Sequence, residues 1–177
     1  MQKKIFTIPN IISFCRILII IFAARELYIG NNINSFILYL TAGLTDFLDG
    51  YLARKLNQIS ELGKMLDPIA DKLMIGTAVI ILLIQARMPI WYVSIIVARD
   101  LFNLLGGLWV SRKIKFVLPS VLIGKIAAVI TMATFMLNIL NVWFIEYLYY
   151  ASVILLLVSS LIYAKIALNE IKIRSTE

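Results

Sequence analysis

The sequence has no histidine and only one cysteine, Cys15, among its 177 residues. A metal site would therefore have to use oxygen ligands, which excludes the nitrogen and sulfur donors typical of zinc and copper sites. Charged residues are also scarce, at 15%, whereas hydrophobic residues make up 62%. This composition, with a mean hydropathy of +0.93, excludes an ordinary soluble domain. Cys15 lies in an apolar run, where we expect a buried and inert thiol.

The hydrophobic residues are gathered in blocks, each long enough for one membrane crossing of about 20 residues. Short links between the blocks predict that consecutive helices are antiparallel neighbours. We therefore expect a single all-α integral membrane domain over residues 1–177, with six transmembrane helices. The expected crossings lie approximately at residues 11–29, 34–54, 66–85, 89–110, 117–140 and 143–165.

Four aspartates lie close together in this apolar sequence. Asp46 and Asp49 are three residues apart, and Asp67 and Asp71 are four apart, so each pair shares one face of its helix. The link between the two helices is short, so we expect the pairs to face each other in a polar cavity open to the cytoplasm. A carboxylate at membrane depth costs roughly 2.5–3.5 kcal/mol, so a group of them indicates bound cations. Oxygen ligands favour Mg²⁺ or Mn²⁺, and a binuclear site suits displacement at phosphorus.

The placement of basic residues indicates the orientation in the membrane. The formal net charge is +7; in a soluble chain this would suggest nucleic acid, but here we expect no nucleic-acid partner. Basic residues gather at both ends of the chain and in the second and fourth links, which the positive-inside rule places in the cytoplasm. We expect a multi-pass protein of a bacterial cytoplasmic membrane, with both termini and the aspartates on the cytoplasmic side.

Further charged residues fall within the second half of the apolar sequence. Arg99 and Asp100 lie midway along one expected crossing, and Lys125 lies in the next. Adjacent helix residues do not face each other, so we expect Arg99 and Asp100 not to be mutual partners. We favour an anion-binding role for Arg99 and Lys125 over a structural one. Arg112 would assist them, or is an ordinary cytoplasmic flanking charge.

The aspartate segment reads D-x₂-D-G-x₂-A-R-x₈-G-x₃-D-x₃-D from Asp46 to Asp71. This pattern resembles the signature of the CDP-alcohol phosphatidyltransferase family. The upstream residues from Pro9 through Ser13 to Arg16 resemble the P-N-x₂-[ST]-x₂-R element that opens many members. The resemblance covers nearly the whole chain. It implies a homodimeric enzyme that transfers a phosphatidyl group from CDP-diacylglycerol to an alcohol, with divalent metal, and releases CMP.

The resemblance also implies roles for individual residues. Asp46, Asp49, Asp67 and Asp71 would hold two divalent cations. Asp71 would also be the general base for the acceptor hydroxyl, unless the metals acidify that hydroxyl directly. Small residues beside the aspartates would leave room for the nucleotide, or would only let the helices approach closely. The residues implied in CDP binding are Asn10, Thr45, Gly50, Ala53, Arg54 and Gly63.

Within the family, the chain is most similar to phosphatidylglycerophosphate synthases, which use glycerol 3-phosphate. The similarity extends to the surroundings of Arg99 and Lys125, but Asp100 replaces a glutamate, Leu108 an arginine and Ala127 a lysine. In these respects the chain is also similar to eukaryotic-type cardiolipin synthases, whose acceptor is phosphatidylglycerol. We place glycerol 3-phosphate first and phosphatidylglycerol second.

Two other classes of function stay open. A divalent-cation transporter would also use aspartates, but the absence of internal repeats counts against it. The expected position of all the carboxylates near one membrane face also counts against it. A non-catalytic scaffold would leave the aspartates unexplained.

Overall fold

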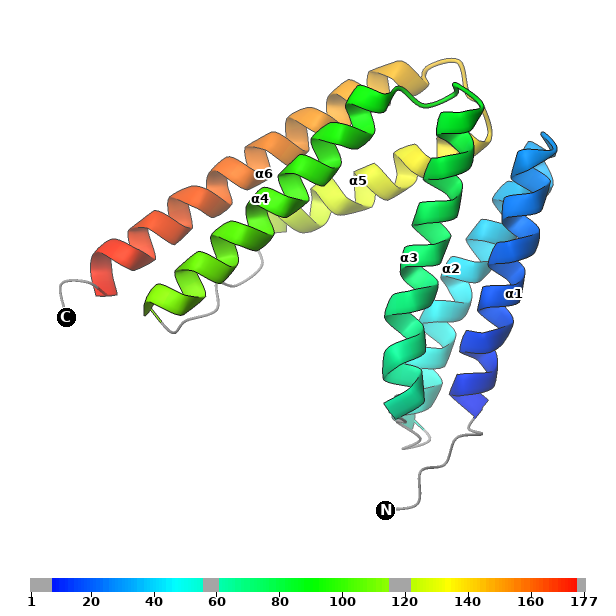
Figure 1. Ribbon diagram of the computed structural model, residues 1–177, viewed down its shortest axis with the longest axis horizontal. Helices are drawn as coiled ribbons and strands as arrows, with labels where there is room; N and C mark the ends of the chain where they lie inside the picture. Colours follow the sequence, from blue (N-terminus) through cyan, green and yellow to red (C-terminus); the bar gives the residue numbers. More distant parts are fainter. Residues whose placement is uncertain (1–7, 56–60, 115–121, 175–177) are drawn as a thin grey trace. The chain divides into compact units, whose positions relative to one another are not determined.

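The computed structural model describes residues 8–55, 61–114 and 122–174, and every regular element in these ranges is an α-helix (Figure 1). Within these ranges, the structure describes only the backbone of residues 8–9, 47, 49–54, 61–65, 111–114 and 172–174. The prediction of an all-helical chain with six helices is confirmed. The helices are α1 (Ile8–Tyr28), α2 (Asn32–Lys55), α3 (Glu61–Ile84), α4 (Ile90–Ile114), α5 (Leu122–Ile139) and α6 (Ile145–Arg174).

Helices α4 and α6 extend beyond the apolar blocks that predicted them. We expected these helices to end near residues 110 and 165, but they continue to Ile114 and Arg174. The added residues include lysines and arginines, which are good helix formers. Hydropathy therefore marks the part of each helix that suits a membrane, and the helix itself continues into the basic flank.

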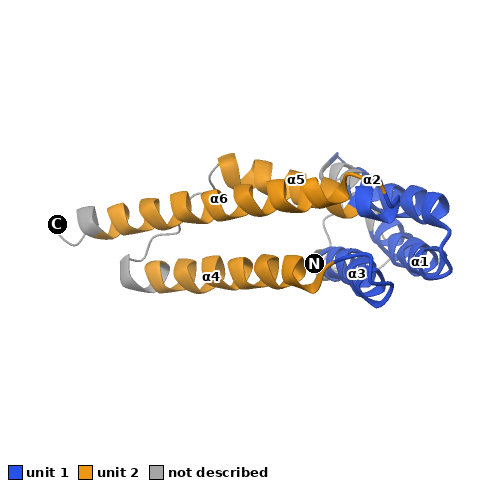
Figure 2. Cartoon of the chain, turned by 90° about the horizontal axis from the view of Figure 1, so that it is seen from above, with its two compact units in different colours: residues 1–88, 136–141 blue, residues 89–135, 142–177 orange. Residues whose placement is uncertain are grey.

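The chain divides into two compact units (Figure 2). The first contains residues 1–88 and 136–141, and the second contains residues 89–135 and 142–177. The first unit thus holds α1, α2 and α3 with the end of α5, and the second holds α4, the rest of α5 and α6. The assignment of the whole chain to one membrane domain stays a prediction.

In the first unit, α1 packs along both α2 and α3 (Figure 1). Among the described residues, α2 and α3 make few contacts with each other, so the main neighbour of α3 is α1 rather than the preceding helix that we expected. The buried residues of α1 recur every three or four positions, which makes one continuous stripe along the helix. That stripe consists of Asn10, Ser13, Arg16, Ile20, Ala23 and Leu27.

The turn between α1 and α2 reverses the chain by a helix C-cap. Gly30 has a φ of +88°, in the left-handed region that glycine adopts without strain. Its N–H donates to the carbonyl of Leu27 at 3.1 Å, and the N–H of Asn31 donates to the carbonyl of Glu26 at 2.9 Å. These two bonds satisfy the last carbonyls of α1. The reversal brings the second half of α2 back beside the first half of α1.

Arg87, in the link after α3, donates hydrogen bonds to α2 and α5. Its Nη2 donates to the carbonyls of Asn138 and Ile139 at 2.7 and 2.8 Å, and its Nη1 donates to Asn32 Oδ1 at 2.8 Å. A cation at the end of a helix satisfies free carbonyls and interacts favourably with the helix dipole. Arg87 therefore stabilises the first unit at the start of α2 and the end of α5.

In the second unit, α4 packs along α6. At one end of this pair, the hydroxyl groups of Tyr92 and Ser152 lie 2.9 Å apart in the interior. The ring of Tyr92 lies 4.5 Å from that of Tyr149 and 5.9 Å from that of Phe135, centroid to centroid. This cluster joins α4, α5 and α6 through aromatic contacts, which are stabilising at these separations.

Three helices of the described chain are long and apolar enough to cross a membrane. In α1 and α3 charged residues interrupt the apolar run, so membrane crossing by the first three helices stays a prediction. Large hydrophobic side chains are nevertheless exposed on all six helices, as expected of helices that face lipid. Cys15 belongs to this exposed surface, so the expectation of a buried thiol is wrong; it lies off the buried stripe of α1. The three apolar spans are Ile90–Val110, Leu122–Ile139 and Ile145–Ile171.

Candidate functional site

The buried stripe of α1 is polar in its first half. Asn10, Ser13 and Arg16 are spaced by three residues and are 5%, 1% and 1% exposed, respectively. Residues three apart lie on the same face of a helix, so these side chains form one polar row, which we call the α1 polar face. The stripe continues with apolar Ile20 and Ala23. Because α1 packs on α2 and α3, the α1 polar face meets the parts of those helices that carry the aspartates.

Arg16 lies between carboxylates of two different helices. Its Nη1 is 2.6 Å from Asp46 Oδ1 of α2 and 3.9 Å from Asp71 Oδ1 of α3. The side chain of Arg16 is 1% exposed, whereas those of Asp46 and Asp71 are 44% and 54% exposed. A buried guanidinium needs paired anions to offset its lost hydration, and a charge-assisted bond of this length is among the stronger hydrogen bonds in proteins. The carboxylates themselves remain open to solvent.

Ser13 connects the third described aspartate to the same face. Its Oγ donates to Asp67 Oδ1 at 3.1 Å. Side chains of α1 thereby contact three of the four aspartates: Asp46, Asp67 and Asp71. The structure brings together two separate parts of the sequence: the element that opens the chain and the aspartate segment.

Thr45 and Asn10 were both predicted in CDP binding. Thr45, directly before Asp46, donates its hydroxyl to the carbonyl of Ala42 at 2.7 Å within α2. Asn10 is buried at the N-terminal end of the α1 polar face. Thr45 thus adjoins Asp46 in the chain, and Asn10 shares the α1 polar face with Ser13 and Arg16. The role of both in CDP binding stays a prediction.

Several predicted residues lie outside the part of the chain whose side chains are described. The backbone at each of these positions is helical, in α2, α3 or α4. Their contacts with metal, nucleotide or acceptor stay predictions. They are Asp49, Gly50, Ala53, Arg54, Gly63 and Arg112.

The donor chemistry of the described aspartates fits a divalent cation of the Mg²⁺ or Mn²⁺ type. Two carboxylates pair with the Arg16 guanidinium and a third accepts a hydrogen bond from Ser13, so this group of side chains carries a formal charge of −2. Carboxylate oxygens are the ligands that Mg²⁺ and Mn²⁺ prefer. Within the described residues, however, no three acidic side chains come close enough together to hold one ion. The proposed fourth ligand, Asp49, is outside the described side chains.

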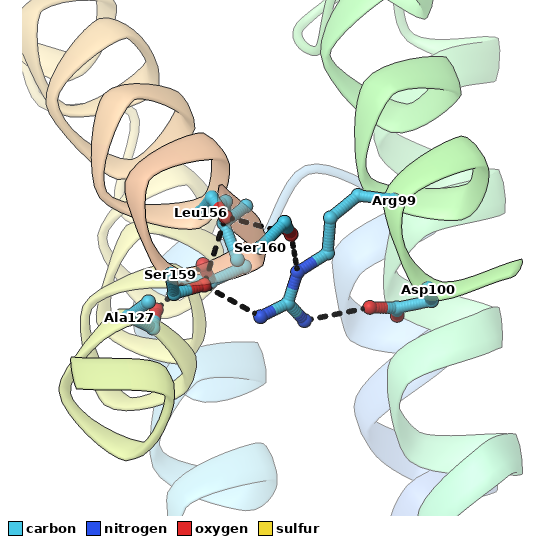
Figure 3. A network of polar contacts seen from close by, with 7 residues as sticks. Arg99, Asp100, Ala127, Leu156, Ser159 and Ser160 are labelled. Carbon is cyan, nitrogen blue, oxygen red and sulfur yellow. Dashed lines mark hydrogen bonds and ion pairs between the residues drawn. The ribbon is translucent and has the colours of Figure 1, made fainter. Parts of the chain in front are cut away.

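A second polar network lies between α4 and α6 (Figure 3). Arg99 donates from Nη2 to Ser159 Oγ at 2.9 Å, from Nε to Ser160 Oγ at 3.2 Å, and from Nη1 to Asp100 Oδ1 at 2.8 Å. The prediction that Arg99 and Asp100 are not partners is therefore wrong. Their Cβ atoms diverge, but the arginine side chain is long enough to reach its neighbour's carboxylate.

The predicted acceptor residues fall into different surroundings. Arg99 is only 18% exposed, and Lys125 is exposed on α5. Arg99 is thus held by α6, whereas Lys125 lies on a different helix. Sequence reasoning missed the serine partners of Arg99. The available signal was a pair of adjacent hydroxyl residues, Ser159 and Ser160, inside an apolar run, where polar side chains face other helices.

Sequence reasoning also gave Ser13 and Arg16 no role of their own. Both were recognised as part of the opening element, and Arg16 is an arginine within an apolar run. A charge in such a place usually faces the bundle interior and a partner. The partners Asp46 and Asp67 could not be assigned without knowing that α1 packs against both α2 and α3.

Comparison with known proteins gives the family. A profile described as CDP-alcohol phosphatidyltransferase matches residues 6–163. The CDP-diacylglycerol–glycerol-3-phosphate 3-phosphatidyltransferase of Rickettsia felis is 37% identical over 137 residues, which cover 75% of this chain and 74% of that protein. The cardiolipin synthase (CMP-forming) of Streptomyces coelicolor is 34% identical over 145 residues, covering 78% and 67% of the two chains.

A eukaryotic relative aligns over a smaller share of its own length. The probable cardiolipin synthase (CMP-forming) of Drosophila melanogaster is 38% identical over 119 residues, which make up 67% of this chain but only 37% of that protein. The chain therefore spans little more than a third of this relative. The family profile covers most of the chain, including both the opening element and all four aspartates, and the chain belongs to the CDP-alcohol phosphatidyltransferase family.

Proposed function

We propose that the protein transfers a phosphatidyl group from CDP-diacylglycerol to glycerol 3-phosphate and releases CMP. The observation that carries the proposal is the contact of Arg16 with Asp46 and Asp71, which joins the opening element to the family's aspartates in one place. Family membership supports the reaction class. The Rickettsia felis relative, aligned over about three quarters of both chains, supports the choice of acceptor.

In the proposed reaction, the acceptor hydroxyl oxygen attacks the phosphorus that carries the diacylglycerol. A new P–O bond forms, the bond from that phosphorus to the oxygen of CMP breaks, and CMP leaves with the bonding electrons. Asp71 takes the hydroxyl proton; its side chain is 54% exposed and so can be reached by an acceptor. Two Mg²⁺ or Mn²⁺ ions bound by the four aspartates would neutralise the diphosphate and the leaving group.

The remaining predicted residues complete the substrate sites in this proposal. Asn10 and Thr45, with Gly50, Ala53, Arg54 and Gly63, contact the CDP part of the donor. Arg99 binds the phosphate of glycerol 3-phosphate, assisted by Lys125 and Arg112. The hydrogen bonds from Arg99 to Ser159 and Ser160 support this role because they fix the orientation of the guanidinium before an anion binds.

We also propose the membrane arrangement expected from the sequence. All six helices cross the membrane, with both termini and the aspartates at the cytoplasmic face, and the protein forms a homodimer. The exposed hydrophobic side chains on α1, α2 and α3 support crossing by these helices as well as by the three more apolar ones.

Cardiolipin synthesis is the second candidate function. Ala127, where a lysine is expected in enzymes that use glycerol 3-phosphate, is fully buried in the second unit. A cation at that position is thus replaced by a small apolar side chain. Two relatives whose names state cardiolipin synthase also favour this alternative, in which phosphatidylglycerol is the acceptor.

Product analysis distinguishes the two candidates. Purified protein is incubated with CDP-diacylglycerol, Mg²⁺ and either glycerol 3-phosphate or phosphatidylglycerol, and the lipids are identified by mass spectrometry. We expect phosphatidylglycerophosphate from glycerol 3-phosphate, with little or no product from phosphatidylglycerol. Cardiolipin from the reaction with phosphatidylglycerol, and no product from the reaction with glycerol 3-phosphate, would instead establish the second candidate.

A further inference from the structure

We infer that Arg16 is a positioning residue, which holds the carboxylates of Asp46 and Asp71 in place for cation binding. The inference rests on the proposed function, because it assigns the two aspartates to the cation site. It adds a role for a residue that is not itself a ligand. Arg16 carries a positive charge and therefore cannot bind the cation.

The contacts of Arg16 fit a positioning role. Nη1 reaches Asp46 on α2 and Asp71 on α3, two helices whose described residues make few contacts with each other. The spacing between those carboxylates is therefore set largely through α1. Arg16 is itself fixed, because its side chain is 1% exposed and a packed interior leaves it little freedom. Ser13, one turn earlier, holds Asp67 in the same way.

A different role for Arg16 predicts the opposite result. If the guanidinium only neutralised the carboxylates, it would compete with a cation for them, and its removal would strengthen cation binding. If it positions the carboxylates, its removal leaves them free to move apart, and cation binding weakens. Partners that orient ligands in this way typically contribute about 10- to 100-fold in metal affinity. The sign of the change therefore separates positioning from neutralisation.

The test measures Mn²⁺ binding to the detergent-purified full chain by electron paramagnetic resonance of the free ion. The variants are Arg16→Gln, which removes the charge, and Arg16→Lys, which keeps the charge but replaces the planar guanidinium with an ammonium group on a shorter side chain. The matched control is Arg25→Gln on the same helix, since Arg25 is exposed and pairs with its neighbour Glu26. Thermal unfolding without metal shows which variants fold, and Arg16→Lys carries the test if Arg16→Gln does not fold.

We expect the dissociation constant for Mn²⁺ to rise about 10- to 100-fold in both Arg16 variants and to stay unchanged in Arg25→Gln. Equal or tighter binding in folded Arg16→Gln or Arg16→Lys would overturn the inference, as would a wild-type protein that binds no Mn²⁺. CMP release by the wild type is measured in parallel. A wild type that binds Mn²⁺ but releases no CMP with any acceptor would contradict the proposed function, while weaker Mn²⁺ binding by the variants would still support positioning.

Discussion

The guanidinium of Arg16 and the carboxylate of Asp46 lie 2.6 Å apart, although 30 residues separate them in the chain. The contact forms because the cap at Gly30 reverses the chain between them. It places a buried cation of α1 against a carboxylate of α2 that remains partly open to solvent. A residue that stabilises the fold thereby also determines where a proposed metal ligand lies.

The first prediction concerns this contact. Asp46→Asn keeps the size of the side chain but removes the charge that pairs with Arg16, so we expect stability to fall by about 1–3 kcal/mol. Thermal unfolding in detergent without metal measures the change. Asp100→Asn is the control; its carboxylate is 61% exposed, and the loss of such a pair typically costs about 0–1 kcal/mol. Equal stability of Asp46→Asn and wild type would argue against a stabilising pair.

The second prediction concerns Ser13. Ser13→Ala removes the hydrogen bond to Asp67, and we expect the Mn²⁺ concentration for half-maximal CMP release to rise about tenfold, as loss of a hydrogen bond to a charged group predicts. Ser94→Ala is the control, because the Ser94 hydroxyl donates to the carbonyl of Ile90 in its own helix. An unchanged Mn²⁺ requirement in Ser13→Ala would show that Asp67 needs no support from α1.

The third prediction concerns the network in Figure 3. Ser159→Ala and Ser160→Ala each remove one partner of Arg99, so we expect a KM for glycerol 3-phosphate about three- to tenfold higher, the effect of one neutral hydrogen bond, with kcat little changed. Ser152→Ala provides the comparison. That serine bonds Tyr92 in the interior, so its loss should lower thermal stability without raising KM. If all three variants raised KM equally, the effect would be on packing rather than on Arg99.

The fourth prediction concerns the close approach of α4 and α6. A Cβ added at Gly107 would lie 3.0 Å from the hydroxyl oxygen of Tyr163, whereas one added at Gly106 meets nothing within 4 Å. We expect Gly107→Ala to be less stable than Gly106→Ala, because its methyl group must displace the Tyr163 hydroxyl while both substitutions gain the same helix propensity. Gly106→Ala should be neutral or stabilising, because alanine is the better helix former.

Removal of the clashing atom checks the cause. Combining Gly107→Ala with Tyr163→Phe deletes the hydroxyl that the new methyl group would meet, so thermal unfolding should return toward that of Tyr163→Phe alone. A Gly107→Ala variant as stable as Gly106→Ala would mean that the Tyr163 side chain moves aside without cost.

The helices and the candidate ligands were predictable from local properties of the sequence. Long apolar blocks gave all six helices, and the spacing of the aspartates indicated oxygen ligands on shared helix faces. The ends of α4 and α6 were not predictable in this way, because lysine and arginine continue a helix after its hydrophobic part has ended. The mutual arrangement of α1, α2 and α3 depends on which helix buries a continuous stripe, and the order of helices along the chain does not determine that.

The partners of Arg16 and Arg99 were the part that sequence reasoning missed. Arg16 was recognised only within an element, since its contacts with Asp46 and Asp71 need tertiary packing. For Arg99, the rule that adjacent helix residues do not face each other holds for Cβ atoms. It does not hold for a side chain long enough to fold back onto Asp100. Flexible side chains therefore limit arguments from helical spacing.

The most direct test of the central claim is CMP release by the purified wild-type protein with CDP-diacylglycerol, glycerol 3-phosphate and Mg²⁺. We predict release that requires glycerol 3-phosphate, that EDTA and Asp67→Ala abolish, and that Arg25→Gln leaves unchanged. Absence of CMP with every alcohol tested, together with nucleotide-independent movement of Mn²⁺ into sealed vesicles, would contradict the account and establish a cation transporter instead.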